Sequence, residues 1–359
     1  MAASETATAV AVPASVSASV SAPTNLPQHL NIVALETVFT GLPAITLPPP
    51  YTFSLTIYER THPDQVGQRL KDADIAIVTT VLIQAAALDP AITPRLRMIT
   101  AMVAGTDSID LPLCRARGIR VLNAHGCNVD AVAEHAVGLY FACRRKMVPS
   151  MQQLHQNLWP ERGTIIHSVL INGLAARSCR DETVAILGYG GVGQRVATLL
   201  KALGMNVIVA GRKGHDTAAE SRVPFLEALK VASVVVLCCP LTDDTRNLLS
   251  TAEFAAIKEA DCVVINVARG GVVDEGALLK ALHSGQIGGA GVDVFAVEPA
   301  GPEVSPLLTP EVAASGLNLV VTPHTAWLGA QTKANQHRML LENLQGFITG
   351  NMNPERIRA

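Results

Sequence analysis

A glycine-rich turn between an apolar strand and an amphipathic helix is the feature that most limits how this chain can fold. Residues 183–187 (TVAIL) form a short apolar run rich in β-formers, and residues 188–193 (GYGGVG) follow it directly. Residues 194–203 then place their apolar side chains on one face at helical spacing. A G-x-G-x-x-G sequence is informative only between a strand and a helix, which is its setting here. The segment therefore predicts a dinucleotide-binding βαβ unit rather than an ordinary glycine-rich turn.

Each glycine of this fingerprint has its own expected steric role. Gly188 would make the tight turn, Gly190 would let the backbone approach a pyrophosphate, and Gly193 would let the helix pack closely against the strand. The pyrophosphate would lie at the helix N-terminus, where free backbone N–H groups point outward.

The end of the next predicted strand indicates which dinucleotide is bound. Residues 206–210 (NVIVA) form that strand, and an NAD-type site would carry Asp or Glu near its end to bind the ribose hydroxyls. This chain has Gly211, Arg212 and Lys213 there instead. No carboxylate repels a 2′-phosphate, and the two cations could bind one. We interpret the pair as favouring NADP(H) over NAD(H), the alternative being a solvated turn with no role in binding.

Three short stretches in the last third of the chain each supply one chemically active side chain. The stretches, each at the end of an apolar run, are residues 266–271 (NVARGG), 293–299 (DVFAVEP) and 322–327 (TPHTAW). They carry Arg269, Glu298 and His324. A histidine moves protons at neutral pH, a neighbouring carboxylate favours its charged form, and an arginine grips a carboxylate through two hydrogen bonds. Together these side chains suit the reduction of a 2-oxo acid, provided that a dinucleotide supplies hydride.

Strand and helix patterns alternate along the chain in two blocks, which is typical of parallel sheets with helices on both faces. In the first block, strands are expected at residues 30–35, 53–58, 75–78, 98–101 and 119–122. In the second block, they are expected at residues 183–187, 206–210, 233–237, 262–266, 289–293 and 318–321. Helices are expected near Ala85 and at residues 65–71, 112–116, 129–156, 194–203, 274–283 and 330–348.

The two blocks predict a dinucleotide-binding domain inserted within a split outer domain. Residues 29–128 and 325–359 would form the outer, substrate-binding domain, and residues 129–324 the dinucleotide-binding domain. Ligands of open parallel sheets bind beyond the carboxyl ends of the strands, so Arg269 and Glu298 would face a cleft between the domains.

Composition and charge argue against several classes of partner. The formal net charge is −2 and no basic stripe is present, which argues against nucleic acid. No apolar run reaches the roughly 18 residues that a membrane span needs. The 7 cysteines lack metal-ligand spacing, so we expect no metal site and buried free thiols in a reducing, cytoplasmic compartment. Residues 1–28 contain Glu5 as their only charged side chain, so we interpret them as a disordered tail rather than a signal peptide.

Several motifs, in this order, resemble the D-isomer-specific 2-hydroxyacid dehydrogenase family. They are residues 103–110 (VAGTDSID), residues 128–135 (NVDAVAEH), the glycine fingerprint and the three stretches above, and the resemblance covers residues 72–350. The implied fold class is α/β, with a Rossmann-type doubly wound parallel sheet inserted in a split flavodoxin-like substrate domain. The implied activity is reduction of a small 2-oxo acid, such as glyoxylate or hydroxypyruvate, by a homodimeric enzyme.

The resemblance also implies roles for individual residues. Arg269 would bind the substrate carboxylate and polarise its carbonyl group, His324 would be the general acid in reduction, and Glu298 would hold His324 in the right tautomer. The backbone N–H groups expected on the substrate carboxylate are those of Val103, Ala104 and Gly105. The cofactor-binding residues expected from the motifs and the resemblance together are Gly188, Gly190, Gly191, Val192, Gly193, Arg212, Lys213, Cys239, Pro240, Thr245, Val267, Ala268, Asp293 and His324.

One departure from the family pattern leaves alternatives open. Trp327 stands where many members carry a small residue, and we expect it to narrow or wall the substrate pocket. The same pattern resembles C-terminal-binding corepressors, which share the fold and sense dinucleotides. An aromatic or bulkier 2-oxo acid as substrate, or a dinucleotide-sensing binding protein with little turnover, are therefore the alternatives. His135 is expected to be structural and His125 to lie in a linker.

Overall fold

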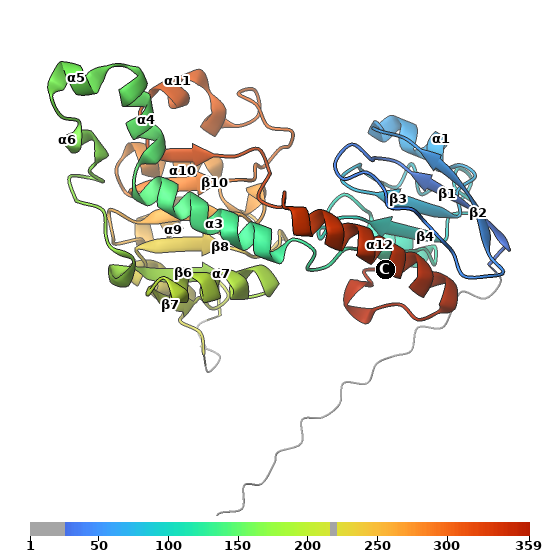
Figure 1. Ribbon diagram of the computed structural model, residues 1–359. Coiled ribbons are helices and arrows are strands. Elements are labelled where there is room, and N and C mark those ends of the chain that lie inside the picture. The colour runs from blue at the N-terminus through green and yellow to red at the C-terminus, as the bar shows by residue number, and fades with distance from the viewer. Residues whose placement is uncertain (1–25, 216–220) are drawn as a thin grey trace, which may run out of the picture. The chain divides into compact units, whose positions relative to one another are not determined.

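The structure, a computed structural model, describes residues 26–215 and 221–359. It divides into two compact units (Figure 1). Unit 1 runs to Cys127 and resumes at Lys333, and unit 2 runs from Asn128 to Thr332. Unit 2 therefore extends beyond residue 324, where the sequence pattern placed its end.

Unit 1 is built on a parallel sheet with the strand order β2-β1-β3-β4-β5. Its strands are β1 (His29–Ala34), β2 (Thr52–Ile57), β3 (Ile75–Val78), β4 (Met98–Ala101) and β5 (Arg120–Leu122). Along β1, Leu30 and Ile32 pack with α12 (Ala330–Thr349), whereas Val33 packs with α1 (Val66–Leu70) and α2 (Leu111–Ala116). Alternate side chains of a strand point to opposite faces, so both faces of this sheet are buried.

Unit 2 is built on a longer parallel sheet with the strand order β11-β10-β9-β8-β6-β7. Its strands are β6 (Thr183–Leu187), β7 (Asn206–Val209), β8 (Val234–Leu237), β9 (Val263–Asn266), β10 (Gly289–Val292) and β11 (Leu319–Val321). After β7 the chain crosses back over β6 to form β8, so the carboxyl end of β6 lies at the point where the strand order reverses. Dinucleotides bind at such a switch point in doubly wound sheets.

Helices cover both faces of the sheet in unit 2 (Figure 1). One face packs against α8 (Phe225–Val231), α9 (Thr251–Ala256) and α10 (Glu275–His283). The other packs against α3 (Val129–Arg144) and α7 (Gly191–Ala202). The remaining short helices of the unit are α4 (Met147–His155), α5 (Leu158–Arg162), α6 (Ile166–Val169) and α11 (Pro310–Ala314). The two parallel α/β sheets confirm the predicted fold class.

The helix predicted over residues 129–156 is wrong in its length. α3 ends at Arg144, Lys146 adopts a left-handed conformation with φ 47°, and a separate helix, α4, follows. Pro149 explains the break, because inside a continuous helix its ring would clash with the carbonyl group of Arg145. Within the first turn of α4 the missing N–H of Pro149 costs nothing, since that group has no helical partner there.

Two smaller expectations also differ from the structure. The helix expected near Ala85 is a hydrogen-bonded turn, in which the Gln84 carbonyl accepts from the backbone N–H groups of Ala87 and Leu88. Of the tail predicted over residues 1–28, residues 1–25 lie outside the described residues. Leu26 packs on the apolar cluster beside α12, and the carbonyl of Gln28 accepts from Thr52 N–H at 2.9 Å, so the folded part begins earlier than expected.

Candidate active site

The glycine turn between β6 and α7 has the steric features of a pyrophosphate site. Gly188 has φ 94°, and a Cβ there would lie 2.6 Å from the backbone nitrogen of Cys239. A Cβ on Gly193 would lie 2.1 Å from the carbonyl oxygen of Gly188, a distance that real contacts do not reach. A Cβ on Gly190 would meet no described atom within 4 Å. The fold therefore needs Gly188 and Gly193, whereas Gly190 faces open space.

The N-terminus of α7 forms the second part of the candidate pyrophosphate site. Gly190 is the N-cap residue and provides no side-chain hydrogen bond to the first turn, which begins at Gly191 and Val192. The first N–H groups of a helix have no partner within the helix and attract anions. Open space at Gly190 and an uncapped helix end fit the pyrophosphate of a dinucleotide.

The residues after β7 form the next part of the candidate cofactor site. Gly211 N–H donates to the carbonyl of Val223 at 2.7 Å, and the exposed side chains of Arg212 and Lys213 follow. The ammonium of Lys213 lies 2.8 Å from the carboxylate of Glu253 in α9. The structure also places Arg222 here, with Nη1 3.5 Å from the carbonyl of Ala210. Sequence reasoning missed Arg222, because it follows the segment 216–220 and belongs to no recognisable motif.

Arg269 is held in a turn at the end of β9. The buried amide of Asn266 accepts from Ala268 N–H at 3.1 Å and donates to the carbonyl of Arg269 at 3.0 Å. The guanidinium of Arg269 donates to the carbonyl of Ala268 at 2.8 Å. A Cβ on Gly270 would lie 1.8 Å from the carbonyl carbon of Phe295. Only glycine at position 270 lets the turn that carries Arg269 approach the loop after β10, where Glu298 lies.

Glu298 lies in a loop that is fixed from both sides. One of its carboxylate oxygens accepts from Phe295 N–H at 2.8 Å. The carboxylate of Glu275, at the start of α10, accepts from Ala296 N–H at 2.7 Å and from the hydroxyl of Ser305 at 2.6 Å. No motif or spacing in the sequence indicated Glu275 as a support of this loop.

His324 pairs with Glu298 across the ends of two strands. The distance from His324 Nδ1 to Glu298 Oε2 is 2.6 Å. Burial alone would raise the pKa of Glu298, but the hydrogen bonds from His324 and Phe295 and the nearby charge of Arg269 outweigh it and lower that pKa. Glu298 is thus ionised at neutral pH. It directs Nε2 of His324 away from itself, and this nitrogen has no hydrogen-bond partner among the described residues.

The backbone at His324 is held in an unusual conformation by Asp293. His324 has φ 52°, in the left-handed region, which only a few per cent of residues other than glycine adopt. Its N–H donates to the carbonyl of Asp293 at 2.7 Å. The buried carboxylate of Asp293 accepts from the hydroxyl of Thr322 at 2.6 Å and from the N–H groups of Thr325 and Ala326 at 2.9 and 3.0 Å. Asp293 therefore fixes the turn that presents the imidazole.

His135, expected to be structural, lies beside the same group. Its Nε2 is 3.0 Å from the hydroxyl of Thr322 and 3.6 Å from a carboxylate oxygen of Asp293. α3 thus contributes a side chain to the support of the turn that carries His324. Thr322, which joins the two, was missed by sequence reasoning, although it is the first residue of the motif 322–327.

The remaining cofactor candidates lie along the ends of β8 and β9. The hydroxyl of Thr245 donates to the carbonyl of Pro240 at 2.7 Å, which closes the loop after β8. Cys239 is buried, and its burial raises the pKa of its thiol to about 11, so the thiol is protonated at neutral pH. Val267 and Ala268 are buried at the end of β9. That these residues bind the cofactor stays a prediction.

The expected substrate residues lie in both units. Trp327, in unit 2, is partly buried against the apolar cluster formed by α3 and α7. Val103, Ala104 and Gly105 follow β4 in unit 1, where the carbonyl of Val103 accepts from Ala124 N–H at 3.0 Å. The N–H groups of these three residues donate no hydrogen bond within the part of the chain that the structure describes. They are thus available to an anion.

Neither a metal centre nor a membrane-spanning helix is found in the part of the chain that the structure describes. No group of three or more His, Cys, Asp and Glu side chains that could hold a metal ion occurs in residues 26–215 and 221–359. In the same residues, no helix combines the length and the apolar character needed to span a membrane.

Comparison with known proteins identifies the class to which this fold and site belong. The family model for the NAD binding domain of D-isomer specific 2-hydroxyacid dehydrogenases matches residues 137–326. The chain is 35% identical over 296 residues to a glycerate dehydrogenase of Methylorubrum extorquens, which covers 82% of this chain and 88% of that protein. It is 34% identical over 266 residues to a glyoxylate reductase of Aeropyrum pernix, which covers 73% of this chain and 76% of that protein.

A solved structure agrees with these relatives. The NADPH-dependent glyoxylate/hydroxypyruvate reductase of Sinorhizobium meliloti matches with a TM-score of 0.70 and 26% identity, over 89% of this chain and 95% of that chain. The protein is therefore an oxidoreductase with an NAD(P)-binding domain. The chain belongs to the D-isomer specific 2-hydroxyacid dehydrogenase family, as its motifs indicated.

Proposed function

We propose that the protein uses NADPH to reduce a small 2-oxo acid, such as glyoxylate or hydroxypyruvate, to the D-2-hydroxy acid. The observation that carries the proposal is the pair formed by His324 Nδ1 and Glu298 Oε2, 2.6 Å apart, in which Nε2 of His324 has no partner among the described residues and the charge of Arg269 acts on Glu298. The names of the relatives from Methylorubrum extorquens and Aeropyrum pernix support the substrate class.

His324, Glu298 and Arg269 have different roles in the proposed reaction. A bound NADPH supplies the hydride that reduces C2 of the substrate. His324 donates a proton from Nε2 to the carbonyl oxygen, and Glu298 stabilises the charged imidazolium before the transfer and holds its tautomer afterwards. Arg269 binds the substrate carboxylate and stabilises the negative charge that develops on the carbonyl oxygen.

NADP(H) as the preferred cofactor is supported by the end of β7. Arg212 is exposed there, no carboxylate occupies the position that binds ribose hydroxyls in NAD-type sites, and Arg222 adds a third cation, which contacts the carbonyl of Ala210 at 3.5 Å. The Sinorhizobium meliloti reductase was solved in complex with NADP and malonate, which agrees with this choice.

We further propose that unit 2 is the dinucleotide-binding domain and that unit 1 is the substrate domain. The uncapped N-terminus of α7 and the open space at Gly190 support the first assignment. The N–H groups of Val103, Ala104 and Gly105 after β4, which donate no hydrogen bond to any described residue, support the second. Buried or partly buried free cysteines agree with a cytoplasmic location, in which thiols stay reduced.

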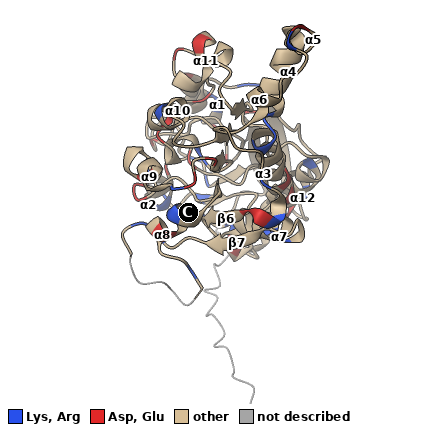
Figure 2. Cartoon of the chain, turned by 90° about the vertical axis from the view of Figure 1, so that its left-hand side faces the viewer, with Lys and Arg blue, Asp and Glu red and all other residues tan. Residues whose placement is uncertain are grey.

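A homodimer is the assembly that we propose, with contacts made by unit 2. Helices α4 and α6 carry no Lys, Arg, Asp or Glu and are drawn in tan in Figure 2. Large apolar side chains on α4 to α6 are exposed: Met147, Met151, Leu154, Trp159 and Ile166. An exposed apolar surface of this kind marks an interaction site.

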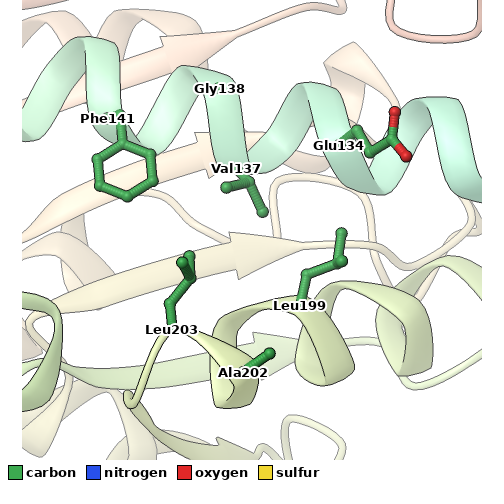
Figure 3. A pocket seen from close by; sticks show the side chains of 7 residues that line it. All are labelled: Glu134, Val137, Gly138, Phe141, Leu199, Ala202 and Leu203. Carbon is green, nitrogen blue, oxygen red and sulfur yellow. The ribbon is translucent and has the colours of Figure 1, made fainter.

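Unit 2 also has a groove between α3, which precedes α4 in the chain, and α7, which follows α6. It has a volume of about 480 Å³ and is lined by Glu134, Val137, Gly138, Phe141, Leu199, Ala202 and Leu203. Figure 3 shows Phe141 and Val137 of α3 facing Leu199 and Leu203 of α7 across it.

Light scattering on the wild type and on Trp159→Ser tests the dimer. A wild type that is monomeric at micromolar concentration would rule it out.

The catalytic proposal is tested by an assay of NADPH and NADH oxidation with glyoxylate, hydroxypyruvate and phenylpyruvate. We expect turnover with the two small acids, and a loss of about 100- to 10,000-fold in kcat for His324→Asn with NADPH binding retained. The exposed His283 at the end of α10 provides the matched control, His283→Asn, which should keep full activity.

Other outcomes of the same assay favour the alternatives. A strong preference for phenylpyruvate would favour an aromatic 2-oxo acid reductase, with Trp327 as part of its pocket. Tight NADPH binding without turnover on any acid would favour a dinucleotide-sensing binding protein. Turnover that survives His324→Asn would remove the acid–base role.

A further inference from the structure

The two cations that follow β7 stand in different electrostatic settings. Arg212 is exposed, and its guanidinium takes part in no hydrogen bond or ion pair with the described residues. Lys213 is engaged instead, because its Nζ lies 2.8 Å from Oε1 of Glu253. The two side chains, adjacent in the sequence, are therefore not equivalent as binders of a phosphate.

Glu253 is fixed in place by the start of α9. Its second carboxylate oxygen accepts from Ser250 N–H at 3.1 Å, and Ser250 in turn caps the backbone of the same helix, so the two residues form a capping box. The side chain of Glu253 is only 7% exposed, whereas that of Lys213 is 42% exposed. The exposed side chain of Lys213 can therefore move toward a ligand, whereas the side chain of Glu253 is held in place by the start of α9.

A 2′-phosphate at the end of β7 would interact with this pair in two ways. The phosphate would attract Lys213, which has to give up or share its contact with Glu253 in order to respond. The carboxylate of Glu253 would also repel the phosphate, since like charges in a partly buried setting are weakly screened. The ribose of NADH carries no charge at this position, so neither effect applies to it.

We propose that Glu253 limits the preference of this protein for NADPH over NADH by holding Lys213 in an ion pair. The inference rests on the NADP(H) site proposed above and names a residue that tunes it. Arg212 supplies the free cation of that site, and Lys213 is a second cation whose contribution Glu253 reduces.

Glu253→Gln separates charge from structure. A glutamine at this position of a capping box can still accept from Ser250 N–H, so α9 keeps its cap. The variant removes the negative charge and frees Lys213. Glu227→Gln is the matched control. Glu227 Oε1 lies 2.7 Å from Lys230 Nζ within α8, and the substitution changes the net charge by the same amount as Glu253→Gln.

Binding is measured by titration calorimetry with NADPH and NADH, and with adenosine 2′,5′-bisphosphate and 5′-AMP as fragments that differ in the 2′-phosphate. We expect Glu253→Gln to tighten binding of the two 2′-phosphorylated ligands by about 3- to 10-fold, the scale of one partly exposed ion pair. NADH and 5′-AMP should change by less than about twofold. Combining Glu253→Gln with Lys213→Met should abolish most of the gain.

Unchanged or weaker binding of the 2′-phosphorylated ligands by Glu253→Gln overturns the inference, as does an equal gain in Glu227→Gln. Failure of the proposed cofactor choice gives a different result. In that case the wild type binds NADH at least as tightly as NADPH, and Arg212→Ala leaves the ratio of the two Kd values unchanged. Glu253→Gln then still shifts the ratio toward NADPH if Lys213 is released as argued.

Discussion

Alanine at Gly190 and alanine at Gly193 should separate dinucleotide binding from folding. A methyl group on Gly193 would lie 2.1 Å from the carbonyl oxygen of Gly188 and 3.3 Å from Cγ2 of Ile186, so the backbone of β6 or of α7 must shift. Overpacking of this kind costs about 1–3 kcal/mol, and the contact with backbone places Gly193→Ala at the upper end. For a unit of this size, a loss of about 3 kcal/mol corresponds to a decrease in Tm of about 6–12 °C.

Gly190→Ala should behave in the opposite way. Gly190 has φ −81° and ψ −165°, which alanine adopts freely, and its Cβ would meet no described atom within 4 Å. The free energy of unfolding should stay equal or rise by about 0.4–1 kcal/mol, because alanine restricts the unfolded chain. The methyl group would, however, fill the space through which a pyrophosphate approaches the backbone, so NADPH affinity should fall by roughly tenfold or more.

Urea unfolding of the ligand-free protein and calorimetric titration with NADPH measure the two effects separately. Gly190→Ala should keep the wild-type unfolding midpoint and lose affinity, whereas Gly193→Ala should lower the midpoint as well. Wild-type affinity in Gly190→Ala would refute the placement of the pyrophosphate. Wild-type stability in Gly193→Ala would refute the close contact between strand and helix.

Three further predictions concern the charged groups of unit 2. Glu298→Gln should lower kcat for reduction, because His324 Nδ1 loses the carboxylate that orients the imidazole and stabilises its charged form; an unchanged kcat would count against the pair. The lowered pKa of Glu298 means that its ionised form stabilises the fold above about pH 4.5 and that this contribution is lost as pH falls through the folded pKa, so the difference in unfolding free energy between wild type and Glu298→Gln should shrink on acidification below that pH. Arg144 is buried between Glu182 and Asp261, with Arg144 Nη2 3.0 Å from Glu182 Oε2, so Arg144→Met should cost about 3–5 kcal/mol in urea unfolding, and a cost below about 1 kcal/mol would contradict this description.

Local patterns in the sequence were sufficient for the strands, the main helices and the identity of the reactive side chains. Apolar runs of strand length alternate with helical spacing, and this alternation determines a parallel sheet covered on both faces. The break between α3 and α4 was also present in the sequence as Pro149, although the pattern of apolar residues around it suggested one continuous helix. The roles of Gly188 and Gly193 follow from backbone sterics alone, which is why the fingerprint can be interpreted without a structure.

Only the tertiary structure determined which partners these side chains have. Lys213 and Arg212 are equivalent in the sequence, but the start of α9 brings Glu253 to Lys213 alone. Glu275 supports the loop of Glu298 because α10 packs beside the end of β10. No local sequence pattern indicates the hydrogen bond from Ala296 N–H to the carboxylate of Glu275. Asp293, expected among the cofactor-binding residues, has both carboxylate oxygens engaged by the turn that presents the imidazole of His324. Such contacts join residues far apart in the chain, so they depend on how helices and strands pack together rather than on the spacing of residues within any one of them.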